Sequence, residues 1–202
     1  MSKKEGKLSF IIVVIGLTIL FIATDSFQAF TAEQARRVQI EKTQPQLKDV
    51  TFEDSESETF RLGESEDVYT IVTFIYTRCG DICPAISMNF RDLYEDIPSE
   101  FLDEKLQLLT VSFDPEYDTP DQLTMYQQSI GADGETWRIV RIEDQQELQQ
   151  FLNQAGVIVI PNEEGGFAHN AAFYLIDPNG RLINIFDYDQ PESVVNHLEK
   201  IF

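Results

Sequence analysis

The sequence predicts an α/β domain, a sheet covered by helices, behind one apolar segment near the amino terminus. Short runs of β-branched and aromatic residues alternate with segments of helical period. Turn and capping residues separate these runs at nearly every junction. Hydrophobic residues make up 43% of the 202 positions, which suits one domain of ordinary size plus a short extra segment.

The first predicted elements lead to the only two cysteines of the chain. Residues 50–62 are expected to form a hairpin that turns at the acidic stretch 54–57. A core strand follows at 68–77, rich in β-branched and aromatic residues, and runs directly into Cys79. Pro84 suits the first turn of the next helix, where its missing N–H costs nothing. That helix should bury one face: Ile86, Phe90, Leu93, Tyr94 and Ile97.

The remaining elements continue the alternation. A second strand is predicted at 106–113, followed by a helix capped by Thr119 with Leu123, Tyr126 and Ile130 on one face. A third strand at 137–142 precedes a helix that ends at Gly156. Residues 171–176 and 182–186 should pair around the turn Asp177-Pro178-Asn179-Gly180, and a last helix opens at Pro191. This order matches a thioredoxin-like fold with an amino-terminal hairpin extension.

The amino terminus has the layout of a signal anchor. Residues 8–23 are nearly all apolar and follow Lys3, Lys4 and Lys7. We expect a cytoplasmic tail at 1–7, one transmembrane helix at 8–27, a stalk or linker at 28–48 and the main domain at 49–202. An uncleaved anchor is favoured over a removed signal. The lysines favour an inside amino terminus, so this single-pass protein would hold its domain on the extracytoplasmic side.

Charge narrows the possible partners. The net charge of −20 would repel a nucleic-acid backbone, so nucleic acid is excluded as a partner. The acidity otherwise serves solubility, or attracts a cationic partner or a metal ion.

The cysteine pair indicates a local chemical device. Cys79 and Cys83 are four residues apart around a predicted helix start, where the positive end of the helix stabilises a thiolate. Two adjacent thiolates suit a soft ion such as Cu(I). The pair could also close into a redox-active disulfide if the flexible loop at Gly80 allows it, or be two inert buried thiols. The spacing alone does not choose between metal and redox chemistry.

Other candidate side chains are sparse. His169 lies in a predicted loop just before a core strand, whereas His197 is expected on the surface of the last helix. Met88 is expected to pack on the first helix rather than bind metal. Asp81 and Asp114 could lie near the cysteines and tune them. A solvated loop carboxylate at Asp81 and a turn former before Pro115 at Asp114 are the favoured interpretations.

Three blocks in the same order resemble the Sco/SenC family. They are residues 76–84, which resemble the motif YTxCPDxCP, residues 111–120, and His169 followed by residues 172–180. The resemblance covers roughly residue 50 to the end. It implies a thioredoxin-like domain that binds one copper ion through Cys79, Cys83 and His169. One departure is Gly80, which stands where the family usually has proline and should loosen the loop.

The resemblance also implies a role. Proteins of this family are implicated in assembling the dinuclear copper site of cytochrome c oxidase, as copper donor, thiol reductant or both. The expected function is therefore a membrane-anchored copper metallochaperone whose partner is the copper-site subunit, not a turnover enzyme. Two alternatives stay open: a thiol-disulfide oxidoreductase that reduces cysteines of a partner, and a peroxidase-like thiol enzyme in which Thr77 or Arg78 activates the cysteine.

Overall fold

The computed structural model describes residues 10–19, 32–47, 50–62, 67–102, 105–162 and 165–202. The chain divides into two compact units, Met1–Thr43 and Gln44–Phe202, which are described separately.

The first unit contains two helical stretches. Residues 10–19 are helical and expose apolar side chains such as Phe10, which is 70% exposed. The expected tail at 1–7 and half of the expected anchor at 8–27 lie outside the described residues. Among the residues that are described, no helix is both long and apolar enough to cross a membrane. Helix α2 (Ala32–Thr43) forms the helical part expected in the stalk, before Pro45.

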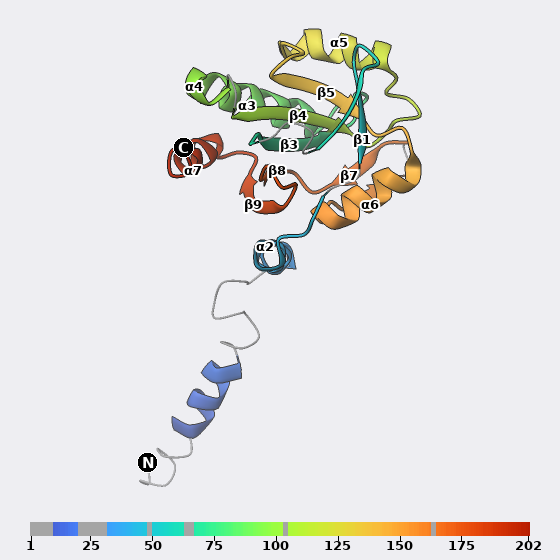
Figure 1. Cartoon of the computed structure of the whole chain (residues 1–202). Coiled ribbons are helices and arrows are strands. Elements are labelled where there is room, and N and C mark those ends of the chain that lie inside the picture. Colours follow the sequence, from blue (N-terminus) through green and yellow to red (C-terminus); the bar gives the residue numbers. More distant parts are fainter. Residues whose placement is uncertain (1–9, 20–31, 48–49, 63–66, 103–104, 163–164) are drawn as a thin grey trace. The chain divides into compact units, whose positions relative to one another are not determined.

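The second unit is built on a seven-stranded sheet in the order β2-β1-β5-β4-β3-β8-β9 (Figure 1). Its centre is parallel: β3 (Tyr69–Ile75) pairs with β4 (Leu106–Ser112), and β4 pairs with β5 (Trp137–Arg141). The hairpin β1 (Thr51–Asp54) and β2 (Thr59–Arg61) extends one edge. The antiparallel pair β8 (Ala172–Ile176) and β9 (Leu182–Asp187) extends the other. Each of these strands lies within two residues of its predicted bounds.

Helices cover both faces of this sheet (Figure 1). The helices are α3 (Cys83–Asp96), α4 (Ser99–Leu102), α5 (Pro120–Ile130), α6 (Gln145–Ala155) and α7 (Pro191–Leu198). Successive residues of β8 show the two layers, because side chains alternate along a strand. Phe173 packs on Phe90 of α3 at 5.0 Å between ring centroids. Tyr174 points to the opposite face and contacts Phe74, which packs on Phe151 of α6.

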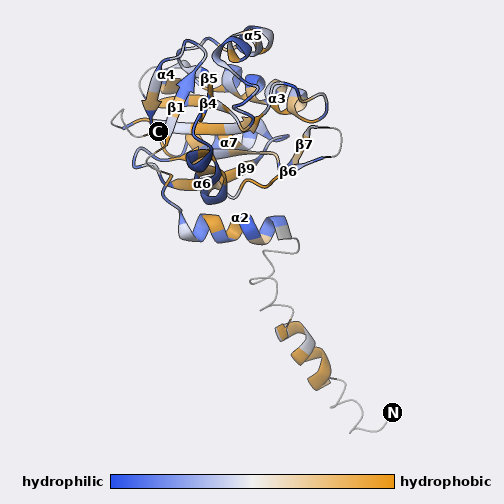
Figure 2. Ribbon diagram, turned by 90° about the vertical axis from the view of Figure 1, so that its right-hand side faces the viewer, coloured by the Kyte–Doolittle hydropathy of each residue, from blue (hydrophilic) through white to orange (hydrophobic). Residues whose placement is uncertain are grey.

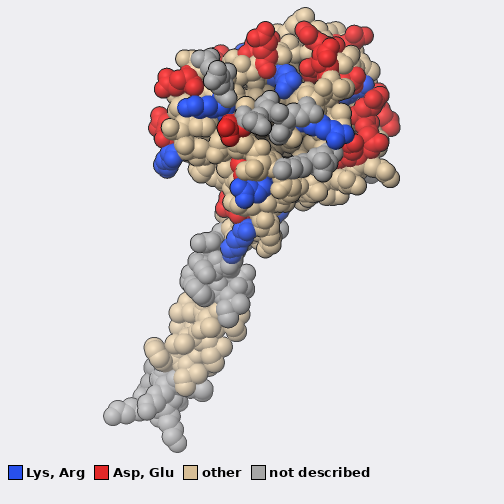
Figure 3. Space-filling view, viewed as in Figure 1, with Lys and Arg blue, Asp and Glu red and all other residues tan. Residues whose placement is uncertain are grey.

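The core between these layers is mainly apolar, and the central strands are coloured as hydrophobic in Figure 2. Trp137 is fully buried, and its indole N–H donates to the hydroxyl of Thr110 at 3.0 Å. The outer surface carries the charge: on the face in Figure 3, acidic side chains gather along one edge and basic side chains are scattered.

Several local details differ from expectation. The predicted loop around His169 contains strand β7 (Phe167–His169), which pairs with β6 (Val159–Pro161) in a two-stranded sheet. Thr119 stands at the N-cap of α5, but its side chain makes no capping hydrogen bond. Along α5 only Leu123 is fully buried, whereas Tyr126 and Ile130 on the same face are partly exposed. Leu47, placed in the linker by the sequence, is 1% exposed and donates its N–H to Gly180.

The topology of the sheet indicates where a site should lie, namely at the carboxyl ends of its parallel strands. The parallel strands β3 and β4 end at the same edge, and the chain leaves β3 toward Cys79 and leaves β4 toward Asp114. In open α/β sheets, functional side chains collect at the carboxyl ends of the strands. The cysteines are therefore held where the fold concentrates chemistry.

Candidate metal centre

The cysteine loop is formed by the chain between β3 and α3. The Cys79 N–H donates to the carbonyl of Tyr76 at 3.1 Å, which closes a turn after the strand. Helix α3 begins at Cys83, and its N-cap residue, Ile82, supplies no side-chain cap. The Cys79 sulfur takes this place by accepting the Cys83 N–H at 3.3 Å. A sulfur at a helix amino terminus is well placed to carry negative charge.

His169 reaches the same place from β7. Its Nε2 atom lies 3.6 Å from the sulfur of Cys83, although 86 positions separate the two residues in the chain. Its Nδ1 atom lies 3.1 Å from the carbonyl oxygen of Asn170. A carbonyl oxygen can only accept, so Nδ1 carries the proton and Nε2 of the neutral ring has a free lone pair. The imidazole is thereby directed at the buried cysteine, and the Phe113 ring packs against it at 4.9 Å.

The two thiols have different protonation behaviour. Burial opposes ionisation of Cys79, but hydrogen bonds from the Cys83 thiol, from the N–H groups of Asp81 and Cys83 and from the Tyr76 hydroxyl outweigh it and lower the Cys79 pKa. Burial raises the pKa of Cys83, and its hydrogen bond to Cys79 adds to this effect. The arrangement is that of one thiolate-prone sulfur, Cys79, beside one protonated thiol, Cys83.

The pKa of His169 is lowered as well. Burial disfavours the imidazolium, and the hydrogen bond to Asn170 only partly opposes this effect. A neutral imidazole is the form that binds a metal ion, and a second-sphere carbonyl on its other nitrogen is the usual means of orienting such a ligand.

Cys79, Cys83 and His169 lie near one another, but their side chains are not yet close enough together to coordinate one metal ion. In the described part of the chain, no three His, Cys, Asp or Glu side chains lie close enough together to hold a metal ion. Cys83 and His169 are in contact, and Cys79 contacts the backbone of Cys83. Cys79 and Cys83 also interact through their sulfurs, so a metal ion would need these two sulfurs and the His169 imidazole to draw closer together. The assignment of all three as ligands therefore remains a prediction.

Asp81 and Asp114, the two possible tuning residues, lie in different surroundings. Asp81 is exposed and contributes its backbone N–H, not its carboxylate, to Cys79. Asp114 forms an ion pair with Arg78 at 2.6 Å, and the Arg78 guanidinium lies over the ring of Tyr117. Arg78 is thus engaged away from the cysteine sulfur.

Asp118 is a residue that the sequence reading missed. It is fully buried, and its carboxylate accepts hydrogen bonds from the N–H and the hydroxyl of Thr77 and from the hydroxyl of Ser112. It therefore ties the loop before Cys79 to the end of β4. The same bonds occupy Thr77, so neither Thr77 nor Arg78 activates Cys79 as a peroxidase-like mechanism would require. The sequence feature that could have identified Asp118 is its position three residues after Pro115, just beyond the end of β4.

Tyr76 was missed too. Its hydroxyl accepts the N–H of Phe167 at 3.2 Å, which links the end of β3 to the strand that carries His169. Its ring packs edge-on against Phe167 at 5.2 Å and also contacts Phe113. Tyr76 thus helps to hold the two halves of the candidate centre together. Its position at the carboxyl end of a predicted strand was the signal available.

The two remaining candidates lie outside the centre. His197 is half-buried against the ring of Phe186 at 5.4 Å, not free on the surface. Met88 was expected to pack, but its side chain is 57% exposed on α3 and lines a cavity that Tyr126 of α5 also lines.

Comparisons with known proteins agree with this architecture. A protein from Bacillus subtilis described as an SCO1 protein homolog is 26% identical over 145 residues, covering 71% of this chain and 73% of its own. The solved structure of a SCO1/SenC family lipoprotein from Bacillus anthracis matches with a TM-score of 0.70 at 22% identity, over 78% of this chain and 95% of its own. Bradyrhizobium japonicum ScoI, solved with copper bound, matches with a TM-score of 0.63 at 22% identity, over 76% and 97%.

These structural matches establish the thioredoxin-like Sco fold of residues 44–202. The SCO1/SenC family model matches residues 39–202, which is most of the chain. The chain therefore belongs to the SCO1/SenC family.

Proposed function

We propose that this protein is a copper carrier that binds one copper ion through Cys79, Cys83 and His169 and passes it to another protein. The observation that carries the proposal is the contact between the Cys83 sulfur and the lone pair of His169 Nε2, at 3.6 Å, beside the thiolate-prone Cys79. Two sulfurs and one imidazole form a soft donor set of the kind that selects Cu(I). A copper-bound relative with the same fold supports the choice of metal.

Each residue has a separate role in this proposal. Cys79 offers the first sulfur because it is half-exposed and its pKa is lowered. Cys83 offers the second only after losing its proton, so copper and a proton compete for the same sulfur. The Asn170 carbonyl holds His169 in the tautomer that presents Nε2. Because the three side chains must draw closer together to hold an ion, we expect the adjustment to occur in the loop at Gly80.

The loop is free to make this adjustment. A side-chain carbon added at Gly80 would meet no atom within 4 Å, so the surrounding protein does not clamp this position. A carrier needs a site that opens as well as closes, because its cargo must leave. Open space at Gly80 is suited to this task.

We further propose that the recipient is the copper-site subunit of cytochrome c oxidase, as the family resemblance implies. The proposed membrane attachment through residues 8–27 would hold the carrier beside a membrane-bound recipient, on the extracytoplasmic side. The lipoprotein relative from Bacillus anthracis supports membrane association as a general arrangement for such a domain. The proposed boundaries are a tail at 1–7, a linker at 28–48 and the copper-binding domain at 49–202.

A thiol-disulfide oxidoreductase is the second candidate, and one observation favours it. The lowered pKa of Cys79 and the raised pKa of Cys83 describe an exposed nucleophile beside a buried partner, which is the division of roles that disulfide exchange uses. Disulfide exchange does not need His169, whereas copper binding in our proposal does.

Copper titration of the full-length chain in detergent, with metal quantification after desalting, tests the leading proposal. We expect one copper ion per reduced chain. We expect no retained copper in Cys79→Ser or Cys83→Ser variants. Retention of copper by both serine variants would show that the cysteine pair is not the binding site.

A further inference from the structure

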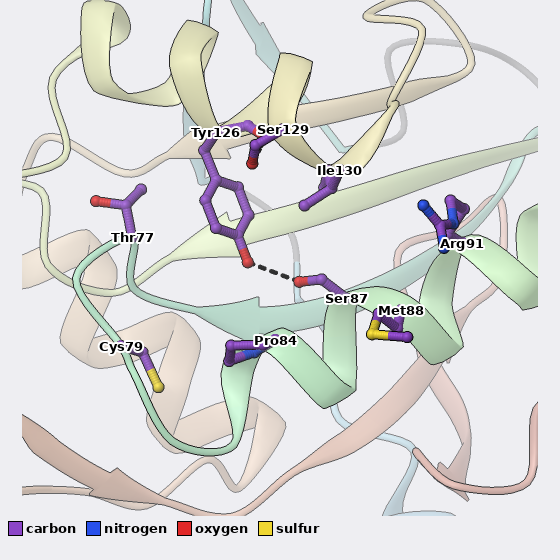
Figure 4. Close-up of a pocket in the computed structure, with 9 residues that line it drawn as sticks. All are labelled: Thr77, Cys79, Pro84, Ser87, Met88, Arg91, Tyr126, Ser129 and Ile130. Carbon is purple, nitrogen blue, oxygen red and sulfur yellow. Dashed lines mark hydrogen bonds between the residues drawn. The ribbon is translucent and has the colours of Figure 1, made fainter.

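A cavity beside the cysteine pair has no role in copper binding as proposed above. Helices α3 and α5 enclose a volume of about 380 Å³, which opens next to Cys79 (Figure 4). Small-molecule sites in proteins typically occupy roughly 300–1,000 Å³, so the cavity can hold a compact ligand.

The cavity has one reactive end and one charged end. In Figure 4, Cys79 lies at one side and Arg91 at the other, with Ser87 and Met88 of α3 between them. The hydroxyls of Ser87 and Tyr126 bond to each other at 2.6 Å and form a polar patch in the middle of the cavity. Ligand sites commonly combine an apolar lining with a few directed polar groups, and this lining has that composition.

The charge of the lining is opposite to that of the protein. The chain carries a net charge of −20, yet no Asp or Glu is found among the described residues that line the cavity. Arg91 is its cation, and the nearest carboxylate oxygen, on Glu95, is 3.9 Å away on a side chain that is 68% exposed. An exposed pair at that distance contributes little, so Arg91 is available to an anionic ligand. An adjoining hollow over α5 is lined by Arg78 and Met125, and the described residues around it include no acidic side chain.

The accessibility of the two sulfurs defines which one a ligand can reach. Cys79 lines the cavity and is half-exposed, whereas Cys83 is 1% exposed. A nucleophile that enters the cavity therefore meets the Cys79 sulfur first.

We propose that this cavity binds an anionic low-molecular-weight thiol, with a carboxylate of the ligand on Arg91 and its sulfur directed at Cys79. The bound thiol reduces the Cys79–Cys83 disulfide and returns the pair to the dithiol state that copper binding needs. The proposal rests on the proposed function because both use the same two cysteines.

The reaction proceeds in two exchanges. The ligand thiolate attacks the Cys79 sulfur, the Cys79–Cys83 bond breaks, and Cys83 leaves as a thiolate that takes up a proton. A second ligand thiolate then attacks the ligand sulfur of the mixed disulfide. This step releases Cys79 as a thiolate and forms the ligand disulfide. Two ligand thiols are oxidised to one disulfide while one protein disulfide is reduced to two thiols.

The kinetics of reduction test this site. Full-length chain in detergent is oxidised, mixed with glutathione as an anionic probe or with 2-mercaptoethanol as a neutral one, and its free thiols are counted after acid quenching. We expect the rate to saturate with glutathione and to rise linearly with 2-mercaptoethanol. S-methylglutathione, which cannot react, should slow reduction by glutathione only.

Two charge variants make the test specific. Arg91→Gln should lower the rate constant at low glutathione concentration about tenfold, the loss expected for one charge-assisted hydrogen bond, and leave 2-mercaptoethanol unaffected. Lys105→Gln removes the same charge just before β4, at the opposite edge of the sheet, and should change neither rate. Linear kinetics with both thiols, or equal effects of the two variants, would overturn the proposal. Saturation with a long cysteine-containing peptide but not with glutathione would also overturn it, in favour of a protein-docking groove.

Two further measurements separate a failure of this proposal from a failure of the copper-carrier proposal. If the disulfide does not form, calorimetric titration of the reduced chain with S-methylglutathione tests the cavity directly, and an absence of binding would overturn the proposal. Copper binding by Arg91→Gln should equal that of the unaltered chain, because Arg91 is not among the proposed ligands. If the unaltered chain bound no copper, the copper-carrier proposal would be refuted. The thiol kinetics would still test the cavity, because they do not depend on copper.

Discussion

Replacing His169 by alanine separates the copper carrier from the reductase. The variant loses the Nε2 atom that lies 3.6 Å from the Cys83 sulfur, and with it one of three proposed copper ligands. Removing even a second-sphere partner of a metal ligand commonly lowers metal affinity about 10–100-fold. We therefore expect His169→Ala to lower copper affinity by about 100-fold or more.

The same substitution should leave the fold and the disulfide in place. It removes the contact between the imidazole and the Cys83 sulfur, worth at most about 1 kcal/mol, and an aromatic contact with Phe113 at 4.9 Å, also worth about 1 kcal/mol. A loss of roughly 2 kcal/mol is small against the roughly 5–15 kcal/mol that stabilises a typical domain. Disulfide formation between Cys79 and Cys83 needs no imidazole and should continue.

Competition against a chromophoric Cu(I) chelator measures the affinity, and thiol counting before and after mild oxidation measures the disulfide. His197→Ala is the matched control, because it removes the other histidine of the chain, which is half-buried on α7. A His169→Ala protein that binds copper within about threefold of the unaltered chain would refute the reasoning, since roughly 0.7 kcal/mol is too little for a lost ligand.

The protonation of His169 adds a test by pH. Its pKa is lowered in the folded protein, so below the ordinary value of about 6.5 the unfolded chain binds the proton more readily. Stability from this group is therefore fully present above about pH 6.5 and is lost as the pH falls through the folded pKa. Urea unfolding between pH 7 and pH 5 should show a steeper loss for the unaltered chain than for His169→Ala. Parallel pH profiles would contradict a buried neutral imidazole.

Three further predictions concern the loop and its support. Iodoacetamide should alkylate Cys79 well before Cys83, because Cys79 has the lowered pKa and the more exposed side chain. Mass spectrometry of peptides would show the order, and equal rates would contradict the different pKa shifts of the two thiols. Asp118→Ala should lower the free energy of unfolding by about 3 kcal/mol in urea titrations, since it leaves buried donors without an acceptor, and a loss under about 1 kcal/mol would show that the loop re-forms its bonds. Gly80→Ala should be neutral or stabilise by up to about 1 kcal/mol, because its new methyl group meets no atom within 4 Å; a destabilised protein in thermal unfolding would show a hidden constraint.

Much of the fold could be predicted from the sequence because its signals are local. Alternating and helical hydrophobic periods located the strands of the main sheet to within two residues, and prolines marked the starts of α3, α5 and α7. The β6–β7 pair was not predicted, since three-residue strands carry too few positions to show a period. Leu123, Tyr126 and Ile130 were predicted to share one face of α5, but only Leu123 is fully buried. A hydrophobic period identifies a face of a helix and not how completely other elements cover it.

The sequence by itself determined that Cys79 and Cys83 share one helix start, because four residues span about one helical turn. It also proposed His169 as their companion, but only through resemblance to a family. The tertiary structure decided that His169 reaches Cys83, that Asp118 is buried beneath the loop, and that a cavity lined by Arg91 opens beside Cys79. These contacts join residues far apart in the chain. Strand register and helix packing bring them together, and neither is encoded in any short stretch of sequence.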